Sequence, residues 1–343
     1  MNDALHLFPS RAAGPFGRRV KHARGGRIPV TVVTGFLGAG KTTLLRRFLA
    51  SPQGRGTAVI VNEFGAIGID DALVRDAAEA TVLLGNGCAC CVTRSDLQVA
   101  LRKLVAERDR GLLPPFGRIV IETSGLADPG PILQTFATDR ALGAEFHAEI
   151  AVAVVDAVTG LATLDWSPEA RKQIILADRL VIAKTDLADT AATARLTERL
   201  ATLNPRAAID IAVHGALDPR RLIAPADDGA LPRTGFAAEA AHADGIVSFV
   251  LTETAPIAWT PFARTMETLT ALRGRDLLRV KGLLDVAGCR GPVLVQFVQH
   301  LAHPPVELAA WPDGDRASRL VFITRGLGEA PVRTLFDAVR AVA

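Results

Sequence analysis

The sequence is poor in cysteine, with four cysteines in 343 residues. Three of them, Cys88, Cys90 and Cys91, lie in one stretch, GNGCACCVTRSD, at residues 85–96. The fourth, Cys289, lies far along the chain, and we expect it to be a small buried or half-buried residue. The clustering of the other three thiols behind a glycine turn indicates a function for them.

Long hydrophobic runs are also absent from the sequence. No uninterrupted apolar run reaches the roughly 20 residues that a membrane helix needs, and no signal peptide is recognisable. The most apolar segment, Ile150–Val155, ends at Asp156 and is typical of a buried strand. We therefore expect no membrane partner and a cytoplasmic location. Thiols in that reducing compartment more often bind metal or catalyse than form disulfides.

A strong net charge is the third absence. The formal net charge is +3, which is too small to indicate nucleic acid as the main partner. Hydrophobic residues make up 49% and charged residues 22%, as in a globular protein with a core, and the length suggests about two domains. Residues 1–27 differ, because they are basic with scattered glycine and proline. We expect a disordered tail or an overlong start there, with a docking arm or a transit peptide as alternatives.

Short apolar runs alternate with amphipathic stretches from Ile28 to about Val213. This pattern predicts an α/β fold, a domain at residues 28–214 with a mostly parallel sheet flanked by helices. Ligands of such sheets bind beyond the carboxyl ends of the strands. The strands are expected at residues 28–34, 58–61, 81–84, 119–121, 152–155, 180–182 and 209–213. The helices are expected from residue 41 and at 95–108, 131–138, 168–177 and 191–203.

The pattern changes after residue 214. Residues 215–243 are rich in alanine, aspartate, proline and glycine and predict a linker. Residues 244–343 then predict a smaller C-terminal α+β domain. Its strands are expected at residues 246–251, 293–298 and 320–323, and its helices at 261–272 and 331–342.

The stretch TGFLGAGKTT contains the pattern of a phosphate-binding loop between an apolar run and a helix. Glycines let successive backbone amides point at phosphate oxygens, and the following helix adds its positive end. Lys41 can reach the β- and γ-phosphates, and the Thr42 hydroxyl can ligate Mg²⁺. The expected nucleotide-binding residues here are Gly35, Gly38, Ala39, Gly40, Lys41, Thr42 and Thr43.

Two further strand ends carry candidate residues. Glu122 ends the run Ile119–Ile121 and can hold Mg²⁺ through water, while Gly125 allows close approach of the backbone to the γ-phosphate. Lys41, Thr42 and Glu122 are therefore the candidate catalytic residues. The alternative is that Glu122 is an exposed acid at the end of a strand.

The stretch RLVIAKTD predicts recognition of the base. A carboxylate accepts hydrogen bonds, so Asp186 in the base plane would select guanine, which offers two adjacent donors. Lys184 would lay its stem along the base. GTP is therefore favoured over ATP, although a surface acid in a loop is the alternative for Asp186.

The ordered motifs GFLGAGKTTLL, VNEFGAIGIDD, GNGCACC, IETSGLADPGPI and AKTDLAD together resemble the CobW-like family of P-loop GTPases. The C-terminal segments LLRVKGLLDV, VLVQFVQHL and SRLVFITRG resemble the CobW C-terminal domain. The resemblance implies a GTPase that serves as a metallochaperone or metal-insertion factor, with a nucleotide-sensing switch at Asn62–Asp70. One departure is Ala183, where the base motif usually has asparagine. Another is the lack of a His-rich stretch between the domains.

The three clustered thiols suit a soft or borderline ion. Adjacent Cys90 and Cys91 cannot easily both reach an ion held by Cys88, so an incomplete shell that can release its ion is expected. Glu63 in the switch is a candidate oxygen ligand. Zinc is the first choice for the metal, and cobalt is second because of the family's link to cobalamin synthesis. A redox-active thiol cluster and inert packing are the alternatives.

The resulting hypothesis is a GTP- and Mg²⁺-dependent metallochaperone. GTP would order the switch and the cysteine loop, and hydrolysis would release the metal to a client metalloprotein. We expect slow hydrolysis alone, with an activating residue supplied by a client or by a second copy in a homodimer. A small-molecule kinase or ATPase on the same loop, and a metal-storage protein that does not hydrolyse nucleotide, are the alternatives.

Overall fold

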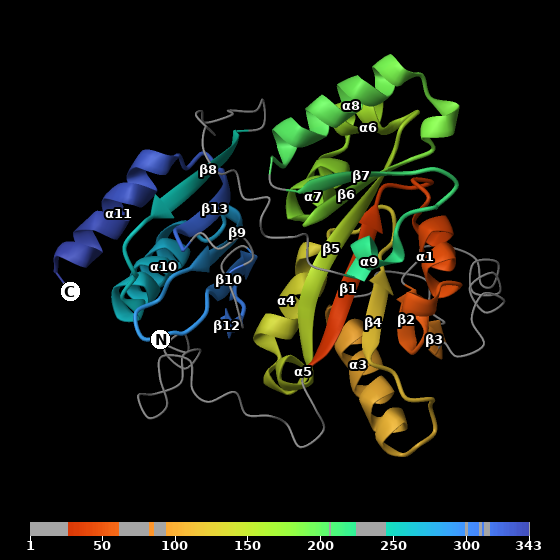
Figure 1. Cartoon of the computed structure of the whole chain (residues 1–343), viewed down its shortest axis with the longest axis horizontal. Coiled ribbons are helices and arrows are strands. Elements are labelled where there is room, and N and C mark those ends of the chain that lie inside the picture. The colour runs from red at the N-terminus through yellow and green to blue at the C-terminus, as the bar shows by residue number, and fades with distance from the viewer. Residues whose placement is uncertain are drawn as a thin grey trace. The chain divides into compact units, whose positions relative to one another are not determined.

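The computed structural model describes residues 27–61, 82–85, 94–205, 207–223, 245–298, 301–308, 311 and 316–342. The described residues fall into two compact units, one up to residue 223 and one from residue 245 onward (Figure 1). In the described helices, none combines the length and the apolar character needed to cross a membrane. The predicted tail at residues 1–27, apart from Arg27, lies outside the described residues.

The first unit is built on a parallel sheet, which confirms the predicted α/β class. Its described strands pair in the order β3-β2-β4-β1-β5-β6-β7, and each of these neighbouring pairs is parallel. The strands are β1 (Ile28–Gly35), β2 (Thr57–Val61), β3 (Val82–Gly85), β4 (Arg118–Glu122), β5 (Phe146–Asp156), β6 (Arg179–Ala183) and β7 (Ala208–Ala212). The helices are α1 (Lys41–Leu49), α3 (Arg94–Asp109), α4 (Gly130–Thr138), α5 (Arg140–Glu145), α6 (Gly160–Trp166), α7 (Pro168–Leu176), α8 (Thr190–Leu203) and α9 (Pro219–Ile223).

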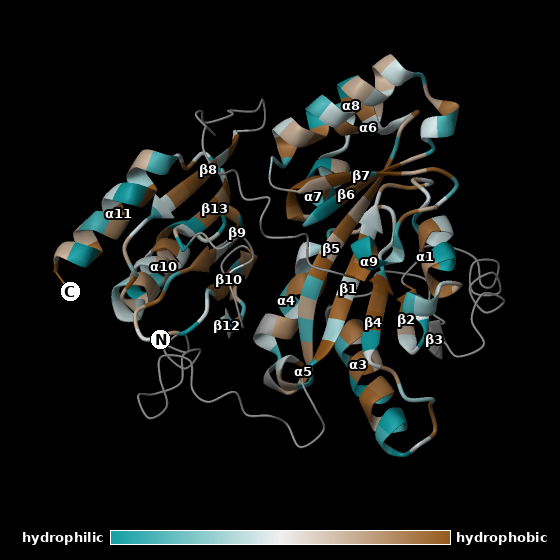
Figure 2. Ribbon diagram, viewed as in Figure 1, coloured by the Kyte–Doolittle hydropathy of each residue, from teal (hydrophilic) through white to brown (hydrophobic). Residues whose placement is uncertain are grey.

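Side chains that alternate along β5 show that helices cover both faces of this sheet. Val152 and Val154 belong to a buried cluster with residues of α1 and α9. Ala153 and Val155 belong to another, with residues of α6, α7 and α8. Strand β5 is buried on both faces and is therefore hydrophobic along most of its length, as Figure 2 shows.

Three short helices of this unit were not predicted. Helices α5, α6 and α9 have six, seven and five residues, too few for an amphipathic period to repeat. Helix α9 lies inside the predicted linker at residues 215–243, yet Leu222 is buried in the core of the first unit. The beginning of that predicted linker is therefore folded, and residues 224–243 lie outside the described residues.

The described residues of the second unit form an antiparallel sheet and two helices, in agreement with the predicted α+β class. The described strands follow the order β11-β10-β9-β13-β8, with β12 beside β10. The strands are β8 (Ile246–Glu253), β9 (Leu277–Leu284), β10 (Val293–Val298), β11 (Leu301–Ala302), β12 (Val306–Glu307) and β13 (Ser318–Arg325), and the helices are α10 (Trp259–Arg273) and α11 (Glu329–Ala341).

Strand β9 is central in this sheet and was missed. Its sequence, LLRVKGLL, places Arg279 and Lys281 among apolar residues, as a half-exposed strand would. In the structure both cations are buried, at 4% and 3% exposure. The alternation of apolar and polar residues in this stretch is that of a strand with one exposed face, so the sequence could have revealed the strand, but not the burial of its charged face.

Candidate functional site

The loop between β1 and α1 turns on three glycines with positive φ, namely Gly35, Gly38 and Gly40. A side chain at Gly35 would lie 2.2 Å from the carbonyl oxygen of Val154, so only glycine allows the loop to pass β5 this closely. Lys41 begins α1 and is buried. Its Nζ donates to the carbonyl oxygens of Gly35, at 2.9 Å, and Phe36, at 3.1 Å. The ammonium group thus lies in the loop in which a phosphate would be cradled.

Ala39 and Thr43 complete the residues predicted for this loop. Ala39 is buried and its amide donates to the carbonyl oxygen of Phe36, which closes the turn. Thr43 is exposed at the start of α1 and lies against Gly215, where a Cβ would be 3.0 Å from the Thr43 methyl group. The loop after β7 therefore approaches the beginning of α1.

Thr42 and Glu122 meet at the carboxyl ends of β1 and β4. The Thr42 hydroxyl donates to Oε1 of Glu122 at 2.7 Å. Glu122 pairs with Val33 across the two strands and is only 1% exposed, so it is not the exposed acid of the alternative interpretation. A hydroxyl and a carboxylate oxygen together are the hard donors that Mg²⁺ prefers, so the two residues fit that ion.

The loop that follows β4 packs directly on the phosphate loop. A Cβ at Gly125 would lie 2.6 Å from the backbone nitrogen of Leu37. Gln173 of α7 is buried, and its Nε2 donates to the carbonyl oxygens of Gly125, at 3.1 Å, and Ala127, at 3.0 Å. Lys172 of the same helix forms an ion pair with Asp128. Helix α7 thus holds the loop at residues 125–128 in place.

The predicted base-recognition residues follow β6. Lys184 has a left-handed backbone with φ 61°, and its Nζ donates to the carbonyl oxygen of Gly38 at 2.6 Å. Asp186 lies in the next turn, where its Oδ2 is 3.7 Å from Nδ1 of His214. His214 and Gly215 follow β7 and both have positive φ. The structure thus brings together the loop after β1, the loop after β6 and the loop after β7.

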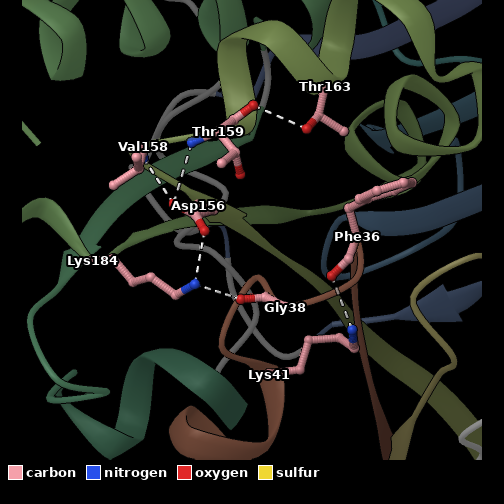
Figure 3. Close-up of polar contacts among 8 residues, drawn as sticks. All are labelled: Phe36, Gly38, Lys41, Asp156, Val158, Thr159, Thr163 and Lys184. Atoms are coloured by element: carbon pink, nitrogen blue, oxygen red, sulfur yellow. Dashed lines mark hydrogen bonds and ion pairs between the residues drawn. The ribbon is translucent and has the colours of Figure 1, made fainter. Parts of the chain in front are cut away.

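Asp156 also belongs to this region, although no sequence motif points to it. Its Oδ2 accepts a hydrogen bond from Lys184 Nζ at 2.7 Å (Figure 3). Burial raises its pKa, but hydrogen bonds from Lys184 and from the Val158 amide outweigh burial, so the pKa of Asp156 lies below its usual value. The available signal was its position, an acid that ends the most apolar strand of the domain.

Cys88, Cys90, Cys91 and Glu63, the predicted transition-metal ligands, lie outside the described residues, as does the predicted switch Asn62–Asp70. The described neighbours fix where these segments begin. Val61 ends β2, Gly85 ends β3, and the two residues are register partners. Both segments therefore start at the same edge of the sheet as the phosphate loop.

Cys289 and the other described ligand residues do not form a metal site. In the part of the chain that the structure describes, no group of three or more His, Cys, Asp and Glu side chains could hold a metal ion. Cys289 packs against the core of the second unit, as expected. Burial raises the pKa of its thiol, and Glu307 and Asp285 add to the effect, so the thiolate is disfavoured.

A parallel sheet with a glycine-rich phosphate loop between its first strand and helix defines a P-loop nucleotide-binding protein. Residues 29–210 match the family model of the CobW/HypB/UreG nucleotide-binding domain, and residues 246–340 match that of the cobalamin synthesis protein cobW C-terminal domain. The chain therefore belongs to the CobW/HypB/UreG family, which confirms the predicted family.

The similarity to known proteins extends over nearly the full length of the chain. The zinc chaperone YjiA of Escherichia coli is 38% identical over 91% of this chain and 99% of its own. The zinc chaperone CobW of Pseudomonas aeruginosa is 31% identical over 94% of this chain and 95% of its own. The crystal structure of Zn(II)-bound YjiA GTPase from E. coli has a TM-score of 0.65 at 32% identity and covers 92% of this chain and 99% of that one.

Proposed function

We propose that this protein is a cytoplasmic GTPase that binds zinc and delivers it to a client protein, with nucleotide bound by residues 28–214. The nucleotide part of the proposal is supported by one geometric observation above all. Thr42 and Glu122, 80 residues apart, meet at 2.7 Å beside the buried Lys41. This is the arrangement that phosphoryl transfer needs, because the reaction depends on positioning and on charge stabilisation.

The described side chains divide the work of the proposed nucleotide site. Thr42 and Glu122 would hold Mg²⁺, which when bound neutralises the charge of the β- and γ-phosphates. Lys41 and the loop amides would bind phosphate oxygens, and Gly125 would bring the backbone of its loop close to the γ-phosphate. Asp186 would accept the guanine donors. The residue that activates water would come from a client or from a second copy of the chain.

The zinc part of the proposal is supported by the relatives, two of which are named zinc chaperones. A third, in Schizosaccharomyces pombe, is named a zinc-regulated GTPase metalloprotein activator, and it is 38% identical over 56% of this chain and 47% of its own. Three cysteines suit zinc, with cobalt second. Cys88, Cys90 and Cys91 follow β3, and Glu63 follows β2. The paired ends of β2 and β3 support a mechanism in which nucleotide and metal act on neighbouring segments.

The crystal structure of a relative decides which quantity the experiment must measure. The Zn(II)-bound crystal structure of YjiA GTPase with one glutamate and two cysteines replaced by alanine is similar to this chain, with a TM-score of 0.69 at 32% identity. Zinc therefore binds that protein without those three side chains. The total amount of bound zinc would not identify the transfer site, so the measurement must follow the nucleotide-dependent part of the affinity.

The test is a competitive zinc titration of metal-free protein, once with Mg²⁺ and GDP and once with Mg²⁺ and a non-hydrolysable GTP analogue. We expect the zinc affinity to rise at least tenfold with the analogue, about 1.4 kcal/mol of coupling. Linkage requires zinc to tighten the binding of the analogue by the same factor. The Cys88→Ser variant should lose this difference, whereas Cys289→Ser, the matched control in the second unit, should keep it.

Two outcomes would contradict the proposal. Equal zinc affinity with both nucleotides would leave the thiols a storage, redox or structural role. Tighter binding of ATP than of GTP in a competition assay would favour the kinase or ATPase alternative. The zinc titration, run with GTP and added client candidates, would measure delivery as transfer of zinc to the client upon GTP hydrolysis.

A further inference from the structure

The side chain of Lys184 connects the base-recognition loop to the phosphate loop. Its Nζ lies 2.6 Å from the carbonyl oxygen of Gly38 and 2.7 Å from Oδ2 of Asp156, as Figure 3 shows. The backbone of Lys184 is left-handed, a conformation that costs a non-glycine residue about 1–2 kcal/mol. The side-chain contacts therefore hold a residue whose backbone does not favour this position.

Asp156 is itself held firmly at the end of β5. It pairs with Ala183 across the sheet, and the Ala157 amide donates to the Ala183 carbonyl oxygen at 2.9 Å. Its second oxygen, Oδ1, accepts the amides of Val158, at 2.7 Å, and Thr159, at 3.4 Å. One carboxylate oxygen is thus used to fix the carboxylate, and the other faces the ammonium group of Lys184.

The residue before Lys184 explains why this support is needed. Ala183 stands where the base motif usually has asparagine, whose side-chain amide would lie near the phosphate loop. The Ala183 methyl group faces that loop, since it lies 3.7 Å from the place that a Cβ of Gly40 would take. A methyl group cannot form hydrogen bonds, so the side chain of residue 183 cannot bridge the two loops.

We propose that Asp156 is a positioning residue of the nucleotide site. By fixing Lys184 against Gly38, it provides the bridge between base loop and phosphate loop that an asparagine at residue 183 would otherwise provide. The inference rests on the proposed nucleotide binding and extends it, because it assigns part of the guanine preference to a carboxylate that does not touch the base. Asp156 acts through Lys184, which would lie along the base next to Asp186.

The test is a double-mutant cycle on the full chain, with Asp156→Asn, Lys184→Met and the double variant. Asparagine can keep the acceptor for the Val158 amide, but it places an uncharged group before Lys184. We expect Asp156→Asn to weaken binding of fluorescent GDP with Mg²⁺ about tenfold, as loss of a charged hydrogen bond does. In the Lys184→Met background the same change should cost less than about twofold, because the effect passes through Lys184.

Two controls separate this role from a general effect on folding. Asp189→Asn removes a carboxylate that caps α8 through the Ala192 amide at 2.5 Å, and it should leave GDP affinity unchanged. Ala183→Asn, added to Asp156→Asn, should restore part of the lost affinity and of the preference for GDP over inosine diphosphate. Thermal melting of each nucleotide-free variant identifies any that fail to fold.

Wild-type affinity for Asp156→Asn, or additive effects of Asp156→Asn and Lys184→Met, would overturn the inference. If Ala183→Asn did not restore binding, the idea that Asp156 and Lys184 replace an asparagine at residue 183 would be wrong. If the wild-type protein did not bind GDP at all, the proposed function would fail instead. The wild-type measurement therefore distinguishes the two failures.

Discussion

Glu122 is the carboxylate that accepts the hydrogen bond from Thr42 at the proposed Mg²⁺ site, and its charge can be removed with little change of shape. Glu122→Gln can still accept the hydrogen bond from Thr42, but it offers the ion no negative charge. We expect a loss of about 10- to 100-fold in GTP hydrolysis, the usual range for groups that support a metal ion. The measurement is phosphate release at increasing Mg²⁺ concentration.

Thr42 supplies the matched pair for that experiment. Thr42→Ser keeps the hydroxyl group and should retain most of the activity, whereas Thr42→Ala removes a proposed Mg²⁺ ligand and should lose it. Equal activity of the serine and alanine variants would show that the hydroxyl does not take part. GDP affinity without Mg²⁺ should be similar in all of these variants.

His147 gives a pH-dependent prediction at the amino end of β5, away from the nucleotide site. The pKa of His147 is lowered from 6.5 to about 4, first by burial and then by the nearby cations Arg27 and Arg118, while a hydrogen bond with the Arg27 backbone opposes the shift. The unfolded chain therefore binds a proton between pH 6.5 and 4 that the folded chain does not. The contribution of neutral His147 to the free energy of unfolding is therefore complete above pH 6.5 and is lost as the pH falls toward 4.

The expected slope for this one proton is about 1.4 kcal/mol per pH unit between those limits. His147→Gln should remove that part of the slope, so the variant should gain stability relative to the wild type as the pH falls. Urea unfolding at pH 7.5, 6, 5 and 4.5 measures both proteins. A difference between them that stays constant over this range would contradict the assigned titration.

At the scale of elements, α7 is the support of the loop that follows β4. Gln173 is 1% exposed and donates to two carbonyl oxygens of that loop. Gln173→Leu would leave both carbonyl groups without this donor, and an unsatisfied buried group costs about 1–3 kcal/mol. We expect a loss of unfolding free energy of that size, together with faster amide hydrogen exchange at residues 125–128.

Lys172, the neighbour of Gln173, allows a comparison on the same helix. Lys172→Met removes its ion pair with Asp128, in which both side chains are about one-third exposed. Exposed pairs contribute about 0–1 kcal/mol, so this change should be the smaller one. An equal or larger effect for Lys172→Met would show that the ion pair, and not Gln173, holds the loop.

The elements also show which features of the fold and of the site could be predicted from the sequence. The sequence could indicate the phosphate loop because its residues are contiguous, and the positive φ of Gly35, Gly38 and Gly40 gives each glycine a conformational reason. Asp156 received no role, since its partner Lys184 is 28 residues away and no local pattern links them. The three short helices were missed because tertiary burial and not periodicity defines them, whereas in β9 only the burial of Arg279 and Lys281 depends on the fold. Positions set by distant contacts need the fold before they can be recognised.

At the scale of the whole molecule, the chain has separate hydrophobic cores in its two units. Val33, Phe48 and Val154 belong to a core of the first unit, while Phe249 and Phe322 belong to the core of the second. All described residues of the proposed nucleotide site lie in the first unit. A ligand stabilises only the cooperative unit that binds it, so the two units should respond differently to nucleotide.

Differential scanning calorimetry should therefore show two unfolding transitions. Mg²⁺ and GDP should raise the melting temperature of one of them. At a ligand concentration 100 times Kd, the stabilisation is about 2.7 kcal/mol. Phe322→Ala, which removes a fully buried ring stacked on Phe249 at 5.0 Å, should lower the other transition by the equivalent of about 3–5 kcal/mol. A single transition, shifted both by Mg²⁺ with GDP and by Phe322→Ala, would mean that the two units unfold together. The nucleotide would then stabilise the C-terminal unit as well.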